Sequence, residues 1–405
     1  MNKNNLQLEN NINRNFIDNK ILKKYEKNIQ KIFQNIIEEI NEPKKTLNVL
    51  SQKYEFNFKF KDLKNFKNFK KIAFIGMGGS ILGAEAISSF LGKSEKRNFY
   101  FFDNIDEKKI SNFKKKENLK KILFLIISKS GNTIETLANV STLNILKKNA
   151  KNIIVITERK NSLLYSLKKK FNLFYVEHKN FIGGRYSVLS EVGIIPAYLM
   201  GKNIYKLRSE IRLFLKGKLA LILKDSSIKL ASILKKNFIH DLILVSYIPE
   251  IEKFLYWCQQ LIAESLGKKN KGFLPVVSTA PKDHHSLLQL YLDGPKNKLF
   301  YIFSLENKLK NNQKIQKKNN QKKLLNNKNL LNIKTAQKEA LIKVFKQKKI
   351  SFREFKIKEF NEEVLGQLFS YFILETIIIG QLVNINPYNQ PAVEQVKTIT
   401  KKILN

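Results

Sequence analysis

The sequence predicts an α/β fold of two doubly wound parallel sheets with helical arms at both ends. Short apolar runs alternate with segments of helical periodicity over residues 66–210, and the same alternation restarts near residue 215. Two strand-to-helix turns, Gly76–Ser80 and Ser128–Thr133, are rich in glycine or hydroxyl side chains. In sheets of this class, ligands bind at the carboxyl ends of the strands.

The first half of the chain supplies an arm and one predicted domain. Residues 1–65 are polar and rich in Lys and Asn, and helical spacing around Ile29–Ile40 predicts an N-terminal helical arm. A glycine-rich turn at Phe181–Ser190 leads to a helix at Val192–Met200, and the first predicted α/β domain spans residues 66–210. The predicted strands are Lys71–Ile75, Asn98–Phe102, Ile122–Ile127, Ile153–Thr157 and Leu173–Val176.

Residues 211–385 form the predicted second domain, and residues 386–405 a C-terminal helix that begins near Gln390. Its strands are Leu242–Ser246, Gly272–Ser278, Lys298–Ser304 and Ile350–Ile357, and its helices Ile251–Leu266, Thr335–Gln347 and Val364–Val383. The segment 307–332 consists almost entirely of Lys, Asn, Gln and Leu, which fits either a helix or a low-complexity insert.

The composition and net charge limit which classes of binding partner are expected. Of 405 residues 43% are hydrophobic, and 74 Lys and Arg against 34 Asp and Glu give a formal net charge of +40. Such a charge is typical of proteins that bind nucleic acid or anionic membranes. Here Lys, Asn, Ile and Phe are over-used together throughout the chain, which indicates compositional drift instead. We therefore predict no nucleic-acid or membrane partner, and a positive field that helps to attract an anionic metabolite.

The compartment follows from cysteine usage and hydropathy. The single cysteine, Cys258, excludes an internal disulfide and fits a reducing compartment. The N-terminal residues M-N-K-N-N-L-Q-L-E-N-N lack the apolar segment of a signal peptide. Val364–Val383 is the most apolar stretch, but glutamines and Glu375 interrupt it, so we interpret it as a core helix. These features predict a soluble cytoplasmic protein.

The turn that follows the apolar run Ile122–Ile127 reads S-K-S-G-N-T and carries three hydroxyl side chains, those of Ser128, Ser130 and Thr133. It connects a buried strand to the N-terminus of a helix, where unpaired backbone N–H groups and the positive end of the helix dipole favour the binding of an anion. We therefore predict that it holds the phosphate of a small substrate. Gly76–Ser80 lacks the third glycine of the dinucleotide fingerprint, and alone it fits a tight turn equally well.

Two further residues are candidates for chemistry on this substrate. Arg185, in I-G-G-R-Y-S, follows two glycines that let the backbone approach a ligand, although an isolated arginine is more often a surface residue. Glu264, in Q-Q-L-I-A-E-S-L-G-K, lies among apolar residues just before Gly267 ends the helix. A partly desolvated carboxylate favours general-base work, although a helix-surface glutamate fits the same pattern.

His284 and His285 stand together in P-K-D-H-H-S. Adjacent helical residues point about 100° apart, so the pair is a poor chelator, and the sequence holds no other His/Cys cluster. We therefore predict no metal and no cofactor; one histidine would transfer a proton and the other would be structural. Lys397 is the last residue of N-P-Y-N-Q-P-A-V-E-Q-V-K, and by itself it is weak evidence for a functional site. Together these groups fit proton transfer next to a carbonyl on a phosphorylated substrate, with cations stabilising an enediolate.

Five motifs in order, from G-M-G-G-S to the C-terminus, resemble those of the phosphoglucose isomerase family of the sugar-isomerase-domain superfamily. I-G-G-R-Y-S-V-L-S is similar to the central signature of that family and N-P-Y-N-Q-P-A-V-E-Q-V-K to its C-terminal signature. The resemblance implies reversible isomerisation of glucose 6-phosphate to fructose 6-phosphate in glycolysis and gluconeogenesis, through ring opening and a cis-enediolate and without metal. It also implies a homodimer with a shared active site.

The resemblance gives each matching residue a role. Glu264 would move the proton between C1 and C2, and Arg185 would stabilise the enediolate. His285, contributed by the neighbouring subunit, would open the sugar ring, and Lys397 would assist. His285 stands in D-H-H-S, where members of the family usually read D-Q-H-S. The implied substrate-binding residues are Gly79, Ser80, Ser128, Lys129 (through its backbone), Ser130, Thr133 and Gln390.

Three positions depart from the family pattern, and they leave rate and affinity open: Glu191 replaces a small residue, Ala392 a glycine, and Asn132 a frequent threonine. Related alternatives are a bifunctional phosphoglucose/phosphomannose isomerase and an aminosugar-phosphate isomerase, against which the C-terminal signature argues. A non-catalytic sugar-phosphate sensor would keep the hydroxyl-rich turn but need neither Glu264 nor Lys397. The alternative that the protein binds nucleic acid is supported by the net charge alone.

Overall fold

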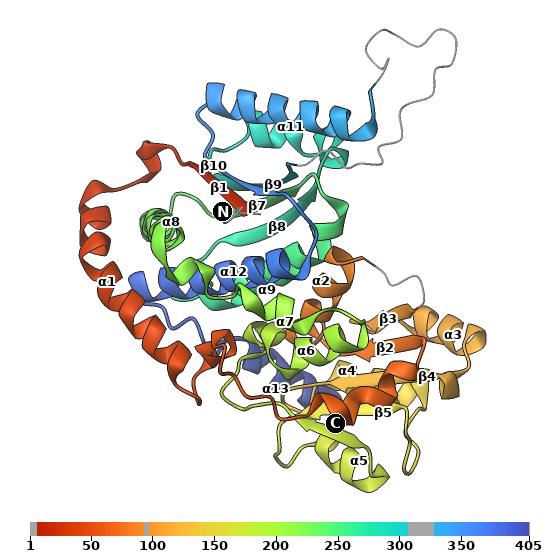
Figure 1. The fold of residues 1–405 in the computed structure, drawn as a ribbon. Coiled ribbons are helices and arrows are strands. Elements are labelled where there is room, and N and C mark those ends of the chain that lie inside the picture. The colour runs from red at the N-terminus through yellow and green to blue at the C-terminus, as the bar shows by residue number, and fades with distance from the viewer. Residues whose placement is uncertain (1–5, 93–96, 307–327, 405) are drawn as a thin grey trace, which may run out of the picture.

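The computed structural model describes residues 6–92, 97–306 and 328–404, and these residues form two five-stranded sheets with helices between and outside them (Figure 1). The first sheet is parallel throughout, with strand order β3-β2-β4-β5-β6. Its strands are β2 (Lys71–Ile75), β3 (Asn98–Phe102), β4 (Ile122–Ile127), β5 (Ile153–Thr157) and β6 (Phe174–Glu177). The predicted strands of this half are confirmed, the last of them shifted by one residue.

The second sheet has the order β1-β10-β9-β7-β8. Its four predicted strands are present as β7 (Asp241–Ser246), β8 (Leu274–Thr279), β9 (Lys298–Leu305) and β10 (Phe352–Ile357), and they run parallel. Its fifth strand is β1 (Leu6–Asn11), which pairs antiparallel with β10 so that Leu6 lies opposite Ile357.

The N-terminal arm, predicted as helical, therefore also contains a strand, and this strand is an antiparallel member of a sheet that was predicted to be parallel. The strand reads L-Q-L-E-N-N, in which Leu6 alone is buried. A segment with two apolar residues gives little local signal, and its pairing depends on a partner at the other end of the chain. The arm continues as α1 (Asn19–Asn41), which the spacing of its apolar residues did predict.

Both sheets are buried on two faces. Successive side chains of a strand point in opposite directions, so a strand whose consecutive residues are all buried must be covered on both sides. In β4, Leu123 and Leu125 face the largest core, whereas Phe124 and Ile126 face a separate core on the outer side of the sheet. The outer core of the second sheet contains side chains of α11 (Leu330–Gln347) and is flanked by those of α10 (Leu288–Asp293). Buried strands of this kind read as continuous apolar runs, which is why the sequence revealed them.

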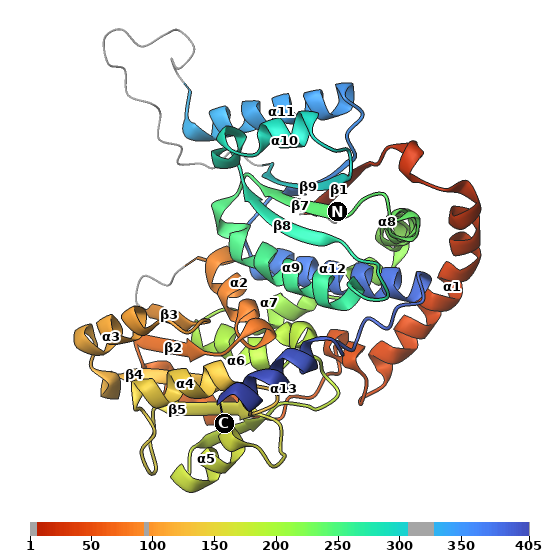
Figure 2. The same cartoon turned by 180° about the vertical axis from the view of Figure 1, so that it is seen from behind.

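Most of the remaining helices lie between the two sheets or along their flanks (Figures 1 and 2). In chain order the helices not yet named are α2 (Leu82–Phe90), α3 (Glu107–Lys116), α4 (Ile134–Leu143), α5 (Leu163–Phe171), α6 (Glu191–Leu199), α7 (Ile204–Ser209), α8 (Gly217–Lys236), α9 (Glu252–Leu266), α12 (Glu362–Leu382) and α13 (Val393–Leu404). The largest core takes side chains from both sheets. The domain boundaries at residues 65, 210 and 385 accordingly stay a prediction.

Helix α12 is long and apolar enough to cross a membrane by length and composition, but 94% of its most apolar window is buried inside the protein. Its interpretation as a core helix is confirmed. The low-complexity segment 307–332 lies outside the described residues up to 327, and its final residues start α11, where Asn329 and Asn332 cap each other's backbone N–H groups.

Candidate active site

The turns after β2 and β4 meet at the carboxyl edge of the first sheet. β2 pairs with β3 on one side and with β4 on the other, and β4 pairs with β5 on its far side, so the chain leaves β2 and β4 in opposite directions. Ligands of open α/β sheets bind at such a switch point. A Cβ placed on Gly76 would lie 3.0 Å from the Ile127 carbonyl oxygen, which shows how closely the turns approach. The topology thus brings the two predicted substrate turns together.

The hydroxyl-rich turn is held by its own side chains. Ser128 Oγ and Thr133 Oγ1 lie 2.8 Å apart, and Ser130 Oγ accepts from the Asn132 amide at 3.2 Å. Gly131 has a φ of +69°, and a Cβ there would meet Ser162 Oγ at 2.2 Å. Only glycine therefore fits, and the turn is shaped before any substrate arrives.

Lys129 belongs to this turn, but its side chain points away from it. The ammonium donates to the Asn180 carbonyl at 2.8 Å and lies 3.6 Å from a Glu158 carboxylate oxygen. Burial lowers the pKa of Lys129. Its backbone carbonyl accepts from the Glu158 amide. These contacts leave its backbone amide as the group available to a ligand, in keeping with a role through the backbone.

The glycine-rich turn positions Arg185. A Cβ on Gly79 would lie 2.3 Å from the Gly184 carbonyl carbon and 2.6 Å from the Arg185 nitrogen. The 3₁₀ turn at Gly78–Ser80 therefore packs backbone to backbone against the 3₁₀ helix Gly184–Leu189. Glycine at position 79 is what allows Arg185 to stand beside the substrate turns.

Arg185 is 2% exposed and uses all five of its N–H donors. Nε donates to Ser265 Oγ at 2.8 Å, and Nη2 donates to the backbone carbonyls of Pro387 at 2.6 Å and Asn389 at 3.1 Å. Nη1 donates to Glu264 Oε2 at 3.0 Å and to Gln390 Oε1 at 2.8 Å. This buried cation thus joins two other predicted site residues, Glu264 and Gln390, which come from distant parts of the chain.

Glu264 lies in the last turn of α9, and its side chain is 31% exposed. Its Oε1 accepts from Gln260 Nε2 at 3.0 Å, one helical turn earlier, while Oε2 accepts from Arg185. The carboxylate is thus held by two donors and still reaches solvent, which differs from the mainly apolar setting that the sequence suggested. Gln260 and Ser265 are the contacts that sequence reasoning left unassigned, although the i, i+4 spacing of Gln260 and Glu264 was a usable signal.

His285 and Lys397 stand apart from this cluster in the single chain. His285 is exposed in the 3₁₀ helix Lys282–His285 and makes no hydrogen bond to any residue the structure describes, whereas His284 Nε2 lies 2.8 Å from the Tyr247 hydroxyl. Burial lowers the pKa of His284. Lys397, on the exposed helix α13, pairs with Glu394 at 2.8 Å. The structure joins Arg185, Glu264 and Gln390, but not these two.

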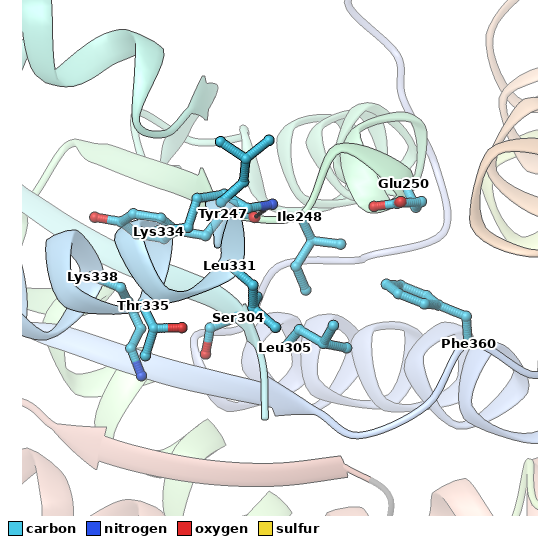
Figure 3. A pocket seen from close by; sticks show the side chains of 11 residues that line it. Tyr247, Ile248, Glu250, Ser304, Leu305, Leu331, Lys334, Thr335, Lys338 and Phe360 are labelled. Atoms are coloured by element: carbon cyan, nitrogen blue, oxygen red, sulfur yellow. Dashed lines mark hydrogen bonds between the residues drawn. The ribbon is translucent and has the colours of Figure 1, made fainter. Parts of the chain in front are cut away.

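The second sheet has its own switch point, between β7 and β9, and the side chains there are different (Figure 3). A cavity of about 170 Å³ lies at the carboxyl ends of these strands and contains none of the predicted site residues. The turn after β7 reads S-Y-I-P and contains no glycine. The two lysines at the cavity already donate hydrogen bonds, Lys334 to the Tyr247 carbonyl and Lys338 to the Glu354 carboxylate. The described residues that line this cavity therefore include neither a glycine nor an unpaired lysine that would bind a phosphate. Within the described ranges, no group of three His, Cys, Asp or Glu side chains suits a metal ion.

Comparison with solved structures shows the fold. A hypothetical protein from Thermus thermophilus superposes with a TM-score of 0.81 at 24% identity, covering 98% of this chain and 99% of that one. A glucose-6-phosphate isomerase from Chlamydia trachomatis gives a TM-score of 0.75 at 16% identity, covering 99% and 88%.

Comparison of sequences is more specific. The probable glucose-6-phosphate isomerase of Methanococcus maripaludis is 34% identical over 90% of this chain and 88% of its own length. The glucose-6-phosphate isomerase of Campylobacter jejuni is 32% identical over 89% and 90%. The family model described as phosphoglucose isomerase matches residues 10–405. With almost the whole chain matched, the protein belongs to the phosphoglucose isomerase family.

Proposed function

We propose that this protein is a glucose-6-phosphate isomerase, which interconverts glucose 6-phosphate and fructose 6-phosphate as an aldose–ketose isomerase of glycolysis and gluconeogenesis. The family match and the names of the relatives support this reaction. The observation that carries it is the buried Arg185, which packs against the Gly78–Ser80 turn and holds a solvent-accessible Glu264. A base, a fixed cation and an anion site are what proton transfer on a sugar phosphate requires.

In the proposed mechanism the phosphate binds the turn formed by Ser128, the Lys129 backbone, Ser130 and Thr133, with Gly79 and Ser80 lining the sugar. Glu264 then removes the proton from C2 of the open-chain aldose and returns it to C1. Negative charge that develops on the enediolate oxygens is stabilised by Arg185. Because both Nη1 donors are engaged, a substrate oxygen reaches Nη1 only by displacing Gln390 or Glu264.

Ring opening falls to His285 and Lys397 in this proposal, with the protein acting as a homodimer. His285 is exposed and without a hydrogen bond to the described residues, which leaves it available to the site of a second copy. The apolar side chains of Val396, Ile399 and Ile403 are exposed on α13, and a second copy would cover them. Lys397 assists when α13 carries it to the substrate. We expect a cytoplasmic location and no metal requirement.

The test is isomerase turnover of purified protein in the presence of a chelator. Glu264→Gln keeps the shape of the side chain but removes the base, and general-base loss costs about 10²–10⁴-fold in rate. Glu250→Gln, at an exposed glutamate beyond β7, is the matched control and should keep wild-type turnover. A wild-type protein no faster than Glu264→Gln would overturn the assignment, and turnover of mannose 6-phosphate at a comparable rate would point to the bifunctional relative.

A further inference from the structure

We propose that Lys268 is a positioning residue for this site. Its ammonium fastens the loop at residues 384–390 to the end of α9, and thereby fixes Arg185 and Gln390 relative to Glu264. The inference rests on the proposed function and goes beyond it, since it gives a role to a lysine that does not touch Glu264, Arg185 or Gln390 directly.

The geometry places Lys268 as a second cation on the same loop. Its Nζ donates to the Ser265 carbonyl at 2.8 Å and to the Asn386 carbonyl at 2.7 Å. Arg185 makes the parallel pair of contacts, to Ser265 Oγ and to the neighbouring Pro387 carbonyl. Each cation therefore joins α9 to the loop. Removing one of them frees the loop on one side only, and Gln390 moves with it.

A second lysine provides an internal comparison. Lys269 Nζ reaches the Asn384 carbonyl at 3.3 Å, but it is exposed, and among the described residues no hydrogen bond or ion pair joins its side chain to α9. It touches the same loop without joining it to the helix that carries Glu264. A general need for positive charge near the loop would involve both lysines, whereas positioning of the site involves Lys268 alone.

The charged state of Lys268 makes the role measurable. Burial, with a smaller contribution from Arg185, lowers the pKa of Lys268 from 10.5 to about 8, and Glu264 opposes the shift. Other titratable groups face the loop as well: Lys269 donates to the Asn384 carbonyl, Tyr186 donates to the Pro387 carbonyl, and Tyr388 within the loop donates to Glu39 Oε2. Lys24, Tyr25, Lys31 and Lys235 line a pocket with Asn384. Lys268 is charged well below pH 8 and loses its charge as the pH rises through 8, so the charge-assisted bonds to both carbonyls weaken there.

The same shift separates positioning from stability. The folded pKa lies below the unfolded one, so between about pH 8 and 10.5 the unfolded chain binds more protons at Lys268 than the folded chain. The contribution of Lys268 to the free energy of unfolding therefore increases over that window. A fall in kcat across it that depends on Lys268 reflects the site and not unfolding of the protein.

The experiment measures kcat and KM of the full-length enzyme between about pH 6.5 and 9.5 for wild type, Lys268→Met, Lys268→Arg and Lys269→Met. We expect Lys268→Met to lower kcat about tenfold with a smaller change in KM, because two charge-assisted bonds are lost, and Lys269→Met to stay within about twofold. Lys268→Arg should recover most of kcat and move the alkaline limb upward by more than about one pH unit, since a guanidinium stays charged.

Two outcomes overturn the inference while leaving the proposed function intact. One is an active wild type in which Lys268→Met and Lys269→Met behave alike. The other is an alkaline limb near pH 8 that does not move in Lys268→Arg, a readout that survives even when Lys268→Met fails to fold. An inactive wild type would overturn the proposed function instead.

Discussion

The protein buries one arginine in each half, Arg185 and Arg353, and each is held by several polar partners. Arg353 donates to Asn10 Oδ1, to the hydroxyls of Tyr301 and Tyr371 and to Glu375 Oε2, and its Nη2 forms an ion pair with Glu375 Oε1. Arg185 donates to a serine, a glutamine, two backbone carbonyls and Glu264. In burial and in having several polar partners the two residues are similar.

They differ in the carboxylate. The Glu375 side chain is 4% exposed and takes a further bond from the Tyr371 hydroxyl at 2.6 Å, so the network around Arg353 is closed. The Glu264 side chain is 31% exposed at the carboxyl edge of the first sheet. A buried arginine therefore indicates function here only when its partner reaches solvent. The Arg353 network joins β1, β9, β10 and α12, and its role is structural.

Removing the carboxylate from the closed network should have the largest effect. Glu375→Leu leaves the Arg353 charge buried without a counter-ion, which costs about 3–5 kcal/mol of unfolding free energy. Chemical denaturation measures it, and the protein that remains folded should turn over normally. The double variant Arg353→Met, Glu375→Leu should recover much of the loss because no charge is then left unpaired. Equal stability of Glu375→Leu and wild type would contradict the closed network.

Replacing the two arginines by lysine should separate their roles. Lysine lacks the fork that reaches Glu264, Gln390 and the loop carbonyls together, so Arg185→Lys should lower kcat about 10²–10³-fold, as expected for loss of transition-state charge stabilisation. Arg353→Lys should lower the unfolding free energy and leave kcat of the folded protein within about twofold. Steady-state kinetics on protein checked by circular dichroism decides between them, and the opposite ranking of kcat would refute the comparison.

The smallest effects concern the second donor to each carboxylate. Tyr371→Phe removes a buried hydroxyl that bonds both Glu375 and Arg353, and we expect a loss of about 1–2 kcal/mol in stability with unchanged turnover. Gln260→Leu removes the amide that holds Glu264 Oε1, and we expect kcat/KM to fall about fivefold with stability nearly constant. Parallel melts and kinetics test the pair, and a kinetic effect of Tyr371→Phe would count against the distinction.

The strands of both sheets were predictable because they are buried on both faces and read as continuous apolar runs. Strand β1 was not, since Leu6–Asn11 has almost no periodicity and its partner lies beyond residue 350. Tertiary pairing, not local propensity, forms it.

The site was partly predictable for a similar reason. Its glycine and hydroxyl turns are local patterns, but the bonds from Arg185 to Glu264 and to the 387–390 loop join segments far apart in the chain. No spacing rule reveals such convergence, and only the resemblance to a family brought Arg185, Glu264 and Gln390 together beforehand. The resemblance also implied His285 and Lys397, which the fold of one chain does not bring to the same place.

Strand β1 also bears on the order in which the protein can form during synthesis. The first sheet is complete once residue 177 has left the ribosome, because all of its strands lie within residues 71–177. The second sheet cannot close until β10 at residues 352–357 has emerged, and until then β1 has no strand to pair with.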